Sequence, residues 1–236
     1  MPARVAIGTS GYSYKEWKGP FYPSDLPAAR MLAFYGERFP TVEINNTFYQ
    51  MPKAAVLEGQ SRQVPPAFSF AFKAPGRITH QKRLKDVADP VKHLWDTVAT
   101  LGPRLGPVLY GLPPNMKKDV ARLAAVLAMT PAGRRVAVEF RHESWFDDET
   151  YAALRAAGAA LCIADTEDFT VPFVATAPWG YLRLRRKDYD DAALASWAAK
   201  LAGATWDDAL VYFKHEDEGR APALAERLRT ALDAAG

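Results

Sequence analysis

Cysteine is almost absent from this chain, and its one example, Cys162, lies inside the apolar run LCIAD. A single cysteine excludes an intramolecular disulfide and is typical of a protein in a reducing compartment. We interpret Cys162 as a small buried hydrophobe rather than as a catalytic thiol. The sequence also lacks an apolar run long enough to span a bilayer, and its N-terminus lacks the apolar core of a signal peptide. We therefore expect a soluble, cytoplasmic protein without a membrane partner.

The chain has little net charge, because its 30 basic residues nearly balance its 27 acidic ones and leave +3. This excess is too small to indicate nucleic-acid binding by charge alone, so any basic patch must be local. Three motifs are missing as well. The G-x-G-x-x-G turn of dinucleotide-binding sheets is replaced by GTSGYS after the first strand, and neither H-E-x-x-H nor paired cysteines occur. At 236 residues and 49% hydrophobic, the chain is long and apolar enough for a large core.

Strand-like and helix-like segments alternate along almost the whole chain. The predicted strands are Val5–Thr9, Thr41–Asn45, Ala67–Lys73, Pro107–Leu112, the start of Arg135–Phe146, Ala160–Asp165, Gly180–Arg185 and Ala209–Lys214. The predicted helices are Leu26–Phe39, Pro52–Arg62, Ala88–Leu101, Lys117–Met129, Asp147–Ala156, Asp190–Leu201 and Ala221–Ala234. Strict βα alternation over this length predicts an α/β fold, a single (β/α)₈ TIM-type barrel domain over residues 1–236. An open doubly wound sheet is the alternative, and the missing glycine-rich turn disfavours it.

One face of each predicted strand is apolar and the other collects polar groups. In a barrel, we expect bulky residues such as Val42, Phe70 and Val138 to face the helices. The opposite face would then carry Glu43, Asn45, Lys73, Glu139, Arg141, Asp165, Arg183, Arg185 and Lys214. These residues lie near the C-terminal ends of their strands, which is where barrel enzymes place their active sites.

Five of these inward positions are cationic and three are carboxylates, which leaves two positive charges in excess. Excess charge in a dry lumen is costly unless a group of opposite sign balances it. One interpretation is that a phosphate or carboxylate ligand binds here. The alternative is that the arginines and glutamates pair with one another and form a plug that closes the barrel. The sequence leaves both interpretations open.

If this end of the barrel is an active site, four residues are candidates for proton transfer. Glu43 and Glu139 come from strands on opposite sides of the ring, His142 follows the fifth strand, and Asp165 ends the sixth. Such chemistry suits a hydrolase or an isomerase acting on a phosphorylated sugar, a nucleotide or a nucleic acid. A metal-dependent sugar-isomerase or endonuclease-like barrel is an alternative, with Asp217 as a further ligand. Because no tight ligand spacing occurs, we assign no metal site, and the sequence indicates neither a cofactor nor an oligomeric state.

Further candidate ligand contacts lie in the predicted loops at this end. They are Tyr12, Tyr14, Trp17, Phe48, Tyr49, Trp145, His80 and His215. The aromatic residues either pack loops onto the barrel rim or form a stacking surface for a sugar or base. A stacking surface beside the basic segment His80–Lys85 could bind a single-stranded nucleic acid. A single-stranded nucleic-acid binding module is therefore an alternative function.

Several longer motifs occur in a fixed order along the chain. They are IGTSGYSYKEW (Ile7–Trp17), TVEINNTFYQMP (Thr41–Pro52), FAFKAPGRITH (Phe70–His80), LPP (Leu112–Pro114), VEFRHESWF (Val138–Phe146) and YFKHED (Tyr212–Asp217). In these motifs the chain resembles the YecE-like family, the domain of unknown function 72. The resemblance implies a TIM-type barrel, but it implies no particular biochemical activity. The chain departs from the family pattern in three places. Gly111 stands where glutamine is common, and the sequences around the ends of the seventh and eighth predicted strands, YLRLRRKD and FKHED, also differ.

Overall fold

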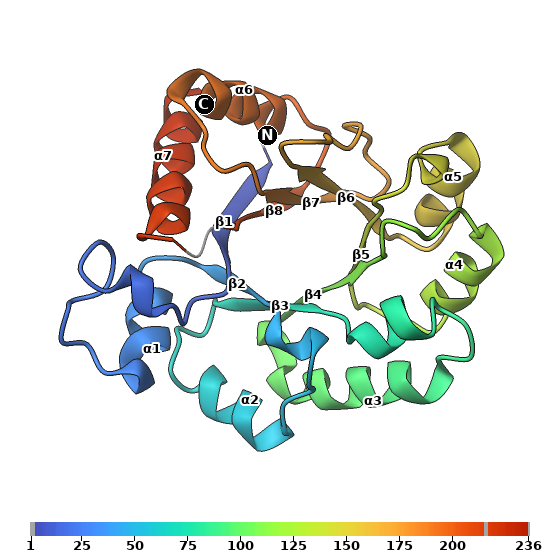
Figure 1. The fold of residues 1–236 in the computed structure, drawn as a ribbon, viewed down its shortest axis with the longest axis horizontal. Helices are drawn as coiled ribbons and strands as arrows, with labels where there is room; N and C mark the ends of the chain where they lie inside the picture. Colours follow the sequence, from blue (N-terminus) through green and yellow to red (C-terminus); the bar gives the residue numbers. More distant parts are fainter. Residues whose placement is uncertain (1–2, 215–216, 236) are drawn as a thin grey trace.

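In a computed structural model, which describes residues 3–214 and 217–235, eight parallel strands close into a barrel (Figure 1). The strands are β1 Arg4–Ser10, β2 Thr41–Ile44, β3 Ser69–Lys73, β4 Leu105–Gly111, β5 Val136–Glu139, β6 Ala160–Asp165, β7 Trp179–Leu184 and β8 Asp208–Phe213. Each strand pairs with the next along the chain, and β8 pairs with β1 from Arg4–Asp208 to Thr9–Phe213. The predicted α/β barrel is therefore confirmed.

Helices surround the strands on the outside of the barrel (Figure 1). They are α1 Met31–Gly36, α2 Ala54–Ser61, α3 Ala88–Val98, α4 Val120–Leu127, α5 Asp148–Ala156, α6 Asp191–Ala202 and α7 Arg220–Ala235. The connection between β6 and β7, described from residue 166 to 178, contains no helix, as the sequence predicted. None of the described helices combines the length and the apolar character needed to cross a membrane.

Two predicted helices are shorter in the structure because their first turns are not α-helical. The predicted helix Leu26–Phe39 becomes a 3-10 turn at Ala28–Arg30 followed by α1. The helix predicted from Lys117 begins only after Asp119, whose side chain accepts a hydrogen bond from the backbone N–H of Arg122. This is the usual role of an aspartate at the N-cap, which satisfies one of the free N–H groups of the first turn.

The apolar side chains divide into two layers, of which the alternation of the strands predicted the outer one. The outer layer lies between strands and helices and contains Val42, Phe70, Val138 and Leu182. A smaller cluster fills the barrel interior, and it consists of Ala71, Leu109, Ala137, Ala160, Cys162, Trp179, Tyr181, Leu210 and Tyr212. Cys162 is thus a buried free thiol, and burial raises its pKa well above the usual value. The ionised side chains Glu43, Glu139 and Arg183 lie above this filling, toward the C-terminal end of the lumen.

Candidate functional site

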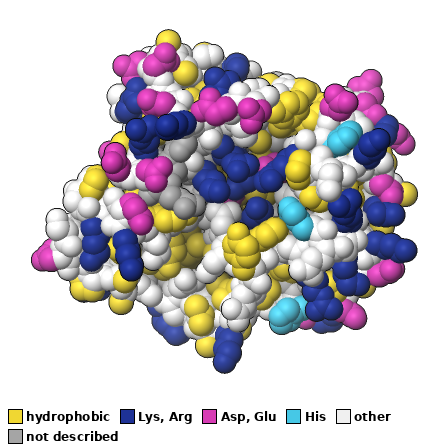
Figure 2. Space-filling view, in the orientation of Figure 1, with side chains coloured by type: hydrophobic (Ala, Val, Ile, Leu, Met, Phe, Trp, Pro, Cys, Tyr) yellow, Lys and Arg dark blue, Asp and Glu magenta, His cyan; other side chains and the backbone are white. Residues whose placement is uncertain are grey.

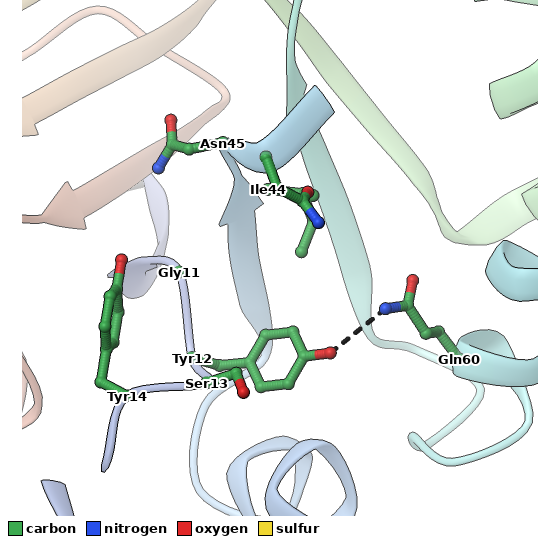
Figure 3. Close-up of a pocket in the computed structure, with 8 residues that line it drawn as sticks. Gly11, Tyr12, Ser13, Tyr14, Ile44, Asn45 and Gln60 are labelled. Carbon is green, nitrogen blue, oxygen red and sulfur yellow. Dashed lines mark hydrogen bonds between the residues drawn. The ribbon is translucent and has the colours of Figure 1, made fainter. Parts of the chain in front are cut away.

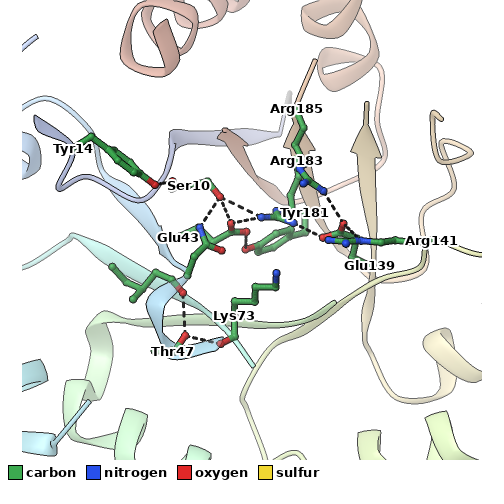
Figure 4. Close-up of polar contacts among 12 residues, drawn as sticks. Ser10, Tyr14, Glu43, Thr47, Lys73, Glu139, Arg141, Tyr181, Arg183 and Arg185 are labelled. Atoms are coloured by element: carbon green, nitrogen blue, oxygen red, sulfur yellow. Dashed lines mark hydrogen bonds and ion pairs between the residues drawn. The ribbon is translucent and has the colours of Figure 1, made fainter. Parts of the chain in front are cut away.

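Three ionised side chains lie in a row across the lumen, near the C-terminal ends of the strands (Figure 4). Glu43 of β2, Glu139 of β5 and Arg183 of β7 are at most 2% exposed. The guanidinium of Arg183 bridges the two carboxylates: Nη2 donates to Glu43 Oε1 at 2.9 Å, and Nη1 donates to Glu139 Oε2. The pairing of both carboxylates with one arginine offsets the cost of burying them.

The remaining carboxylate lone pairs of this buried ion network are also used. Ser10 donates to Glu43 Oε1, and the Tyr181 hydroxyl donates to Glu43 Oε2 at 2.7 Å. Burial, together with the neighbouring Glu43 charge, raises the pKa of Tyr181 well above its usual value, so its hydroxyl stays a donor. Neither Ser10 nor Tyr181 was identified from the sequence, although both have the inward parity of their strands.

Glu139 also anchors two arginines that reach the open end of the barrel. Its Oε1 accepts from Arg141 Nε at 2.9 Å and from Arg185 Nη1 at 3.2 Å. Burial by itself would raise the pKa of Glu139, but Arg183, Arg141 and Arg185 outweigh burial and hold this pKa far below its usual value. Glu139 therefore stays ionised near neutral pH and cannot act there as a general acid.

Arg141 and Arg185 carry donors that the protein leaves unused. Their side chains are 29% and 23% exposed. In the described part of the chain, each makes only its one hydrogen bond to Glu139, and Arg185 Nε is buried without a partner. A space-filling view shows lysine and arginine side chains gathered in the hollow over the barrel axis (Figure 2). Apart from the buried Arg185 Nε, the unused donors therefore belong to partly exposed side chains at the mouth, where a solute can reach them.

Lys73 adds a further positive charge on the opposite side of the lumen. Its ammonium lies 4.5 Å from the centre of the Phe48 ring and has no hydrogen bond or ion pair with any described residue. Burial first, and then Arg183, lower the pKa of Lys73 from 10.5 to about 8. Among the described residues that act on Glu139 there are thus four cations, Arg183, Arg141, Arg185 and Lys73, which exceed the two buried glutamates by two positive charges.

Gly111 leaves space beside Lys73. A Cβ at this position of β4 would lie 3.4 Å from Cε of Lys73 and 3.8 Å from Oε2 of Glu139. These are ordinary contact distances, so a Cβ would fit between the lysine and the carboxylate without displacing either. Because glycine stands at this buried position, room for about one methyl group beside Lys73 is left unfilled.

The two described histidines predicted at this end lie in loops outside the ion network. His80 belongs to a single π-helical turn, Arg77–Gln81, and its Nδ1 is 2.9 Å from the Thr79 hydroxyl. Burial, followed by Lys73 and Arg141, lowers the pKa of His80. His142 instead accepts a hydrogen bond from the backbone N–H of Ser144, and no bond between described residues joins it to Glu139.

The expectation that Asp165 lies in the lumen is wrong. Asp165 pairs in register with Leu184, which belongs to the outer layer, and therefore has outward parity. Its carboxylate accepts from Thr170 Oγ1 and from Arg186 Nε, both at 2.9 Å. The sequence could not show this orientation, because both faces of β6 are apolar (ALCIAD) and the alternation that identifies the inward face is missing.

Two tryptophans predicted as ligand contacts are fully buried and instead pack the loops. Trp17 lies against Tyr14 with ring centroids 4.8 Å apart. Trp145 stacks on Phe140 at 4.6 Å and donates from Nε1 to the carbonyl of Met116. The structure thus favours the packing interpretation for both. Tyr49, by contrast, is 87% exposed on the loop after β2.

A separate cavity of about 260 Å³ adjoins the ion network on the β1–β2 side (Figure 3). Tyr12, Tyr14, Asn45 and Gln60 are among its lining residues. Asn45 Nδ2 donates to the hydroxyl of Ser10 at 2.9 Å, while its Oδ1 is buried without a partner. One hydrogen bond therefore separates the cavity wall from a residue of the buried network.

The remaining predicted residues follow β8 or concern metal binding. Lys214 is partly buried, and its backbone N–H donates to the carbonyl of Leu184 at 3.1 Å. His215 lies outside the described residues. Within residues 3–214 and 217–235, no group of three or more His, Cys, Asp and Glu side chains is placed to hold a metal ion. The ligand set Glu139, Asp165, His142 and Asp217 is therefore not assembled.

Comparison with known proteins places the chain in a family. Residues 6–236 match the family described as "Protein of unknown function DUF72". The chain belongs to the DUF72 family. The UPF0759 protein YecE of Escherichia coli (strain K12) is 32% identical over 143 residues, which are 60% of this chain and 50% of YecE. YunF of Bacillus subtilis (strain 168) is 25% identical over 68% of this chain and 60% of its own length. The chain thus spans about half the length of the curated relatives that it matches.

Solved structures agree with the family assignment. The DUF72 family protein TM1631 from Thermotoga maritima MSB8 superposes with a TM-score of 0.88 and 27% identity, over 98% of this chain and 99% of its own. D-psicose 3-epimerase from Clostridium cellulolyticum H10 superposes with a TM-score of 0.54 and 11% identity, over 97% of each chain. The second similarity shows the barrel fold alone.

Proposed function

We propose that this DUF72 protein is an enzyme that acts on a small anionic substrate, such as a phosphorylated sugar or a nucleotide, at the C-terminal mouth of the barrel. The observation that carries the proposal is the pair of unbalanced positive charges around Glu139. They belong to partly exposed side chains with unused donors, and charge-assisted hydrogen bonds from arginine are well suited to phosphate and carboxylate. The unpartnered Arg185 Nε supports the same conclusion, because buried donors normally have a partner.

In this proposal, the charged residues have two distinct roles. Glu43, Glu139 and Arg183 are buried and paired with one another, so they support the site and do not exchange protons with substrate. Arg141 and Arg185 bind the anion, and the charge of Lys73 assists them. Proton transfer falls to His80, whose lowered pKa keeps its imidazole neutral near pH 7 and able to accept a proton.

The cavity beside the ion network suits the uncharged part of such a substrate. Its wall combines the tyrosine rings of Tyr12 and Tyr14 with the amides of Asn45 and Gln60. Aromatic faces and amide groups are a common combination around sugars and bases. The free Oδ1 of Asn45 would accept a hydroxyl or an amino hydrogen. The buried thiol of Cys162 is consistent with the cytoplasmic location proposed from the sequence.

Calorimetric titration with inorganic phosphate and ribose 5-phosphate at low ionic strength tests the proposal. Arg141→Gln should weaken binding about tenfold or more, because it removes a charge-assisted contact worth roughly 1.5–3 kcal/mol. Arg122→Gln is the matched control, since Arg122 forms an exposed pair with Asp119 on α4 and should bind as the wild type does. Absence of binding, or equal binding by both variants, would overturn the proposal.

A single-stranded oligonucleotide distinguishes the nucleic-acid alternative. An extended strand contacts several phosphates, so its affinity should fall steeply as salt is added. If the oligonucleotide binds more tightly than ribose 5-phosphate and shows such a slope, the binding-module function replaces the enzyme proposed here.

A further inference from the structure

Lys73 is exceptional among the cations of the lumen because the described protein gives it no carboxylate or hydrogen-bond partner. Arg183 is paired with both glutamates, and Arg141 and Arg185 are paired with Glu139. The side chain of Lys73 instead extends from β3 toward the network with its Nζ unbonded (Figure 4). Because Lys73 forms no ion pair with a described residue, pairing with a carboxylate does not explain why a lysine stands at this position.

The surroundings of Lys73 are those of a reactive amine. Its Nζ lies over the face of Phe48 at 4.5 Å, and the missing side chain at Gly111 leaves space beside its Cε. Burial is the main factor that opposes its protonation; the guanidinium groups of Arg183 and Arg141 act in the same direction, and the charges of the two glutamates act against them. With a pKa of about 8, roughly a quarter of the amine is neutral at pH 7.5, against about one part in a thousand for a free lysine. A lysine crowded by other cations is a recognised form of activated nucleophile.

We propose that Lys73 is a nucleophile that forms a Schiff base with a substrate containing both a carbonyl group and an anionic group. The proposal rests on the function proposed above, in which Arg141 and Arg185 hold the anion. It narrows the substrate class to phosphorylated aldehydes and ketones or to oxo-acids. The anion would bind at the arginines, and the carbonyl carbon would face Lys73 across the space that Gly111 leaves open.

The covalent step is a condensation that consumes one proton and releases one water. The lone pair of neutral Nζ forms a bond to the carbonyl carbon, and the π electrons of C=O move to the oxygen. The nitrogen loses a proton to solvent, and the oxygen takes one up, which gives a carbinolamine. A second proton then converts the hydroxyl into departing water while the nitrogen lone pair forms the C=N bond. The protonated imine carries the same charge as the ammonium it replaces, so Glu43 and Glu139 favour it as well.

Reductive trapping tests the proposal on the wild-type protein. Dihydroxyacetone phosphate and pyruvate are each incubated with the protein and sodium cyanoborohydride, which delivers hydride to the imine carbon. Intact mass spectrometry should show one adduct per chain, heavier by the carbonyl compound less one oxygen atom, and peptide mapping should place it on Lys73. The probe that reacts faster identifies phosphate or carboxylate as the preferred anion. Inorganic phosphate should slow trapping by at least tenfold.

Lys73→Arg is the decisive variant, because it keeps the positive charge but cannot form an imine. It should lose trapping completely while it still binds inorganic phosphate in calorimetry, which also shows that it is folded. Lys200→Met serves as the matched control, since Lys200 is exposed and lies 4.6 Å from the ring of Trp197. That variant should be trapped at the wild-type rate.

Three outcomes would overturn either the Schiff base at Lys73 or the anion-binding function on which it rests, and they distinguish the two. Phosphate binding without any adduct at Lys73 refutes the Schiff base but remains consistent with the anion site. Adducts that persist in Lys73→Arg, or that are distributed over surface lysines, also refute the Schiff base at Lys73. An adduct at Lys73 that forms equally with acetone and is insensitive to phosphate refutes the anionic substrate and the proposed function with it.

Discussion

Replacement of Lys73 by methionine should stabilise the folded protein at pH 7, although it removes a charge from the candidate site. The folded state lowers the pKa of this lysine from 10.5 to about 8, so it disfavours the ammonium relative to the unfolded chain. At about 1.4 kcal/mol for each tenfold change in proton affinity, this difference corresponds to roughly 3 kcal/mol. The side chain is partly exposed, and solvent screening reduces the expected gain to about 1–2 kcal/mol.

The dependence on pH separates this charge effect from a simple gain in apolar burial. Below about pH 8, Lys73 is charged in both the folded and the unfolded state, so the full penalty applies. Between pH 8 and 10.5 the folded state releases its proton first, and the penalty falls toward zero. The advantage of Lys73→Met over the wild type should therefore shrink steadily across this interval.

Urea unfolding followed by tryptophan fluorescence, at neutral pH and again near pH 10, measures both quantities. Lys200→Met is again the control, and it should change stability by less than about 0.5 kcal/mol at either pH. If Lys73→Met is less stable than the wild type at neutral pH, and the difference does not change with pH, the ammonium stabilises the fold. That result would refute the argument that the site holds an unbalanced charge.

Two further substitutions test the buried network and the open space at the mouth. Arg183→Met leaves two buried carboxylates without their shared partner and should destabilise the protein by roughly 3–5 kcal/mol in chemical denaturation. The control is Arg135→Met at an exposed ion pair, which should cost less than about 1 kcal/mol. Similar small losses for both would contradict a buried network. Gly111→Gln should change stability by less than about 1 kcal/mol but weaken phosphate binding in calorimetry, because the new side chain extends between Lys73 and Glu139. Unchanged binding would show that the anion does not enter this space.

The barrel and its outward face were predictable from the sequence because both depend on local periodicity. Alternation along β2, β5 and β7 identified which residues face the helices, and it also placed Glu43, Glu139 and Arg183 inside. A period of two is set by the pleat of each strand, so no knowledge of distant contacts is needed. The order of strands around the barrel then follows from right-handed βα units.

The pairing of the inward charges was not predictable in the same way. The sequence left open whether Glu139 is a catalytic carboxylate or part of a plug, because that depends on which cations reach it across the lumen. Asp165 was misplaced because its strand is apolar on both faces, and its true partner, Arg186, follows a different strand. The burial of Trp17 and Trp145 depends on how long loops fold back on the rim, for which sequence periodicity carries no signal.

The two interpretations that the sequence left as alternatives, an anion site and a plug of paired charges, are compatible with each other. A buried ion network is a weak source of stability, since well-packed apolar residues often serve as well, and the layer below this one is in fact apolar. Glu139 nevertheless takes one donor each from Arg141 and Arg185 and leaves their other donors unused. Guanidinium groups that are already oriented lose less conformational entropy when they bind an anion. We infer that the plug is the support of the site, which explains why charges are placed where apolar side chains would fill the barrel equally well.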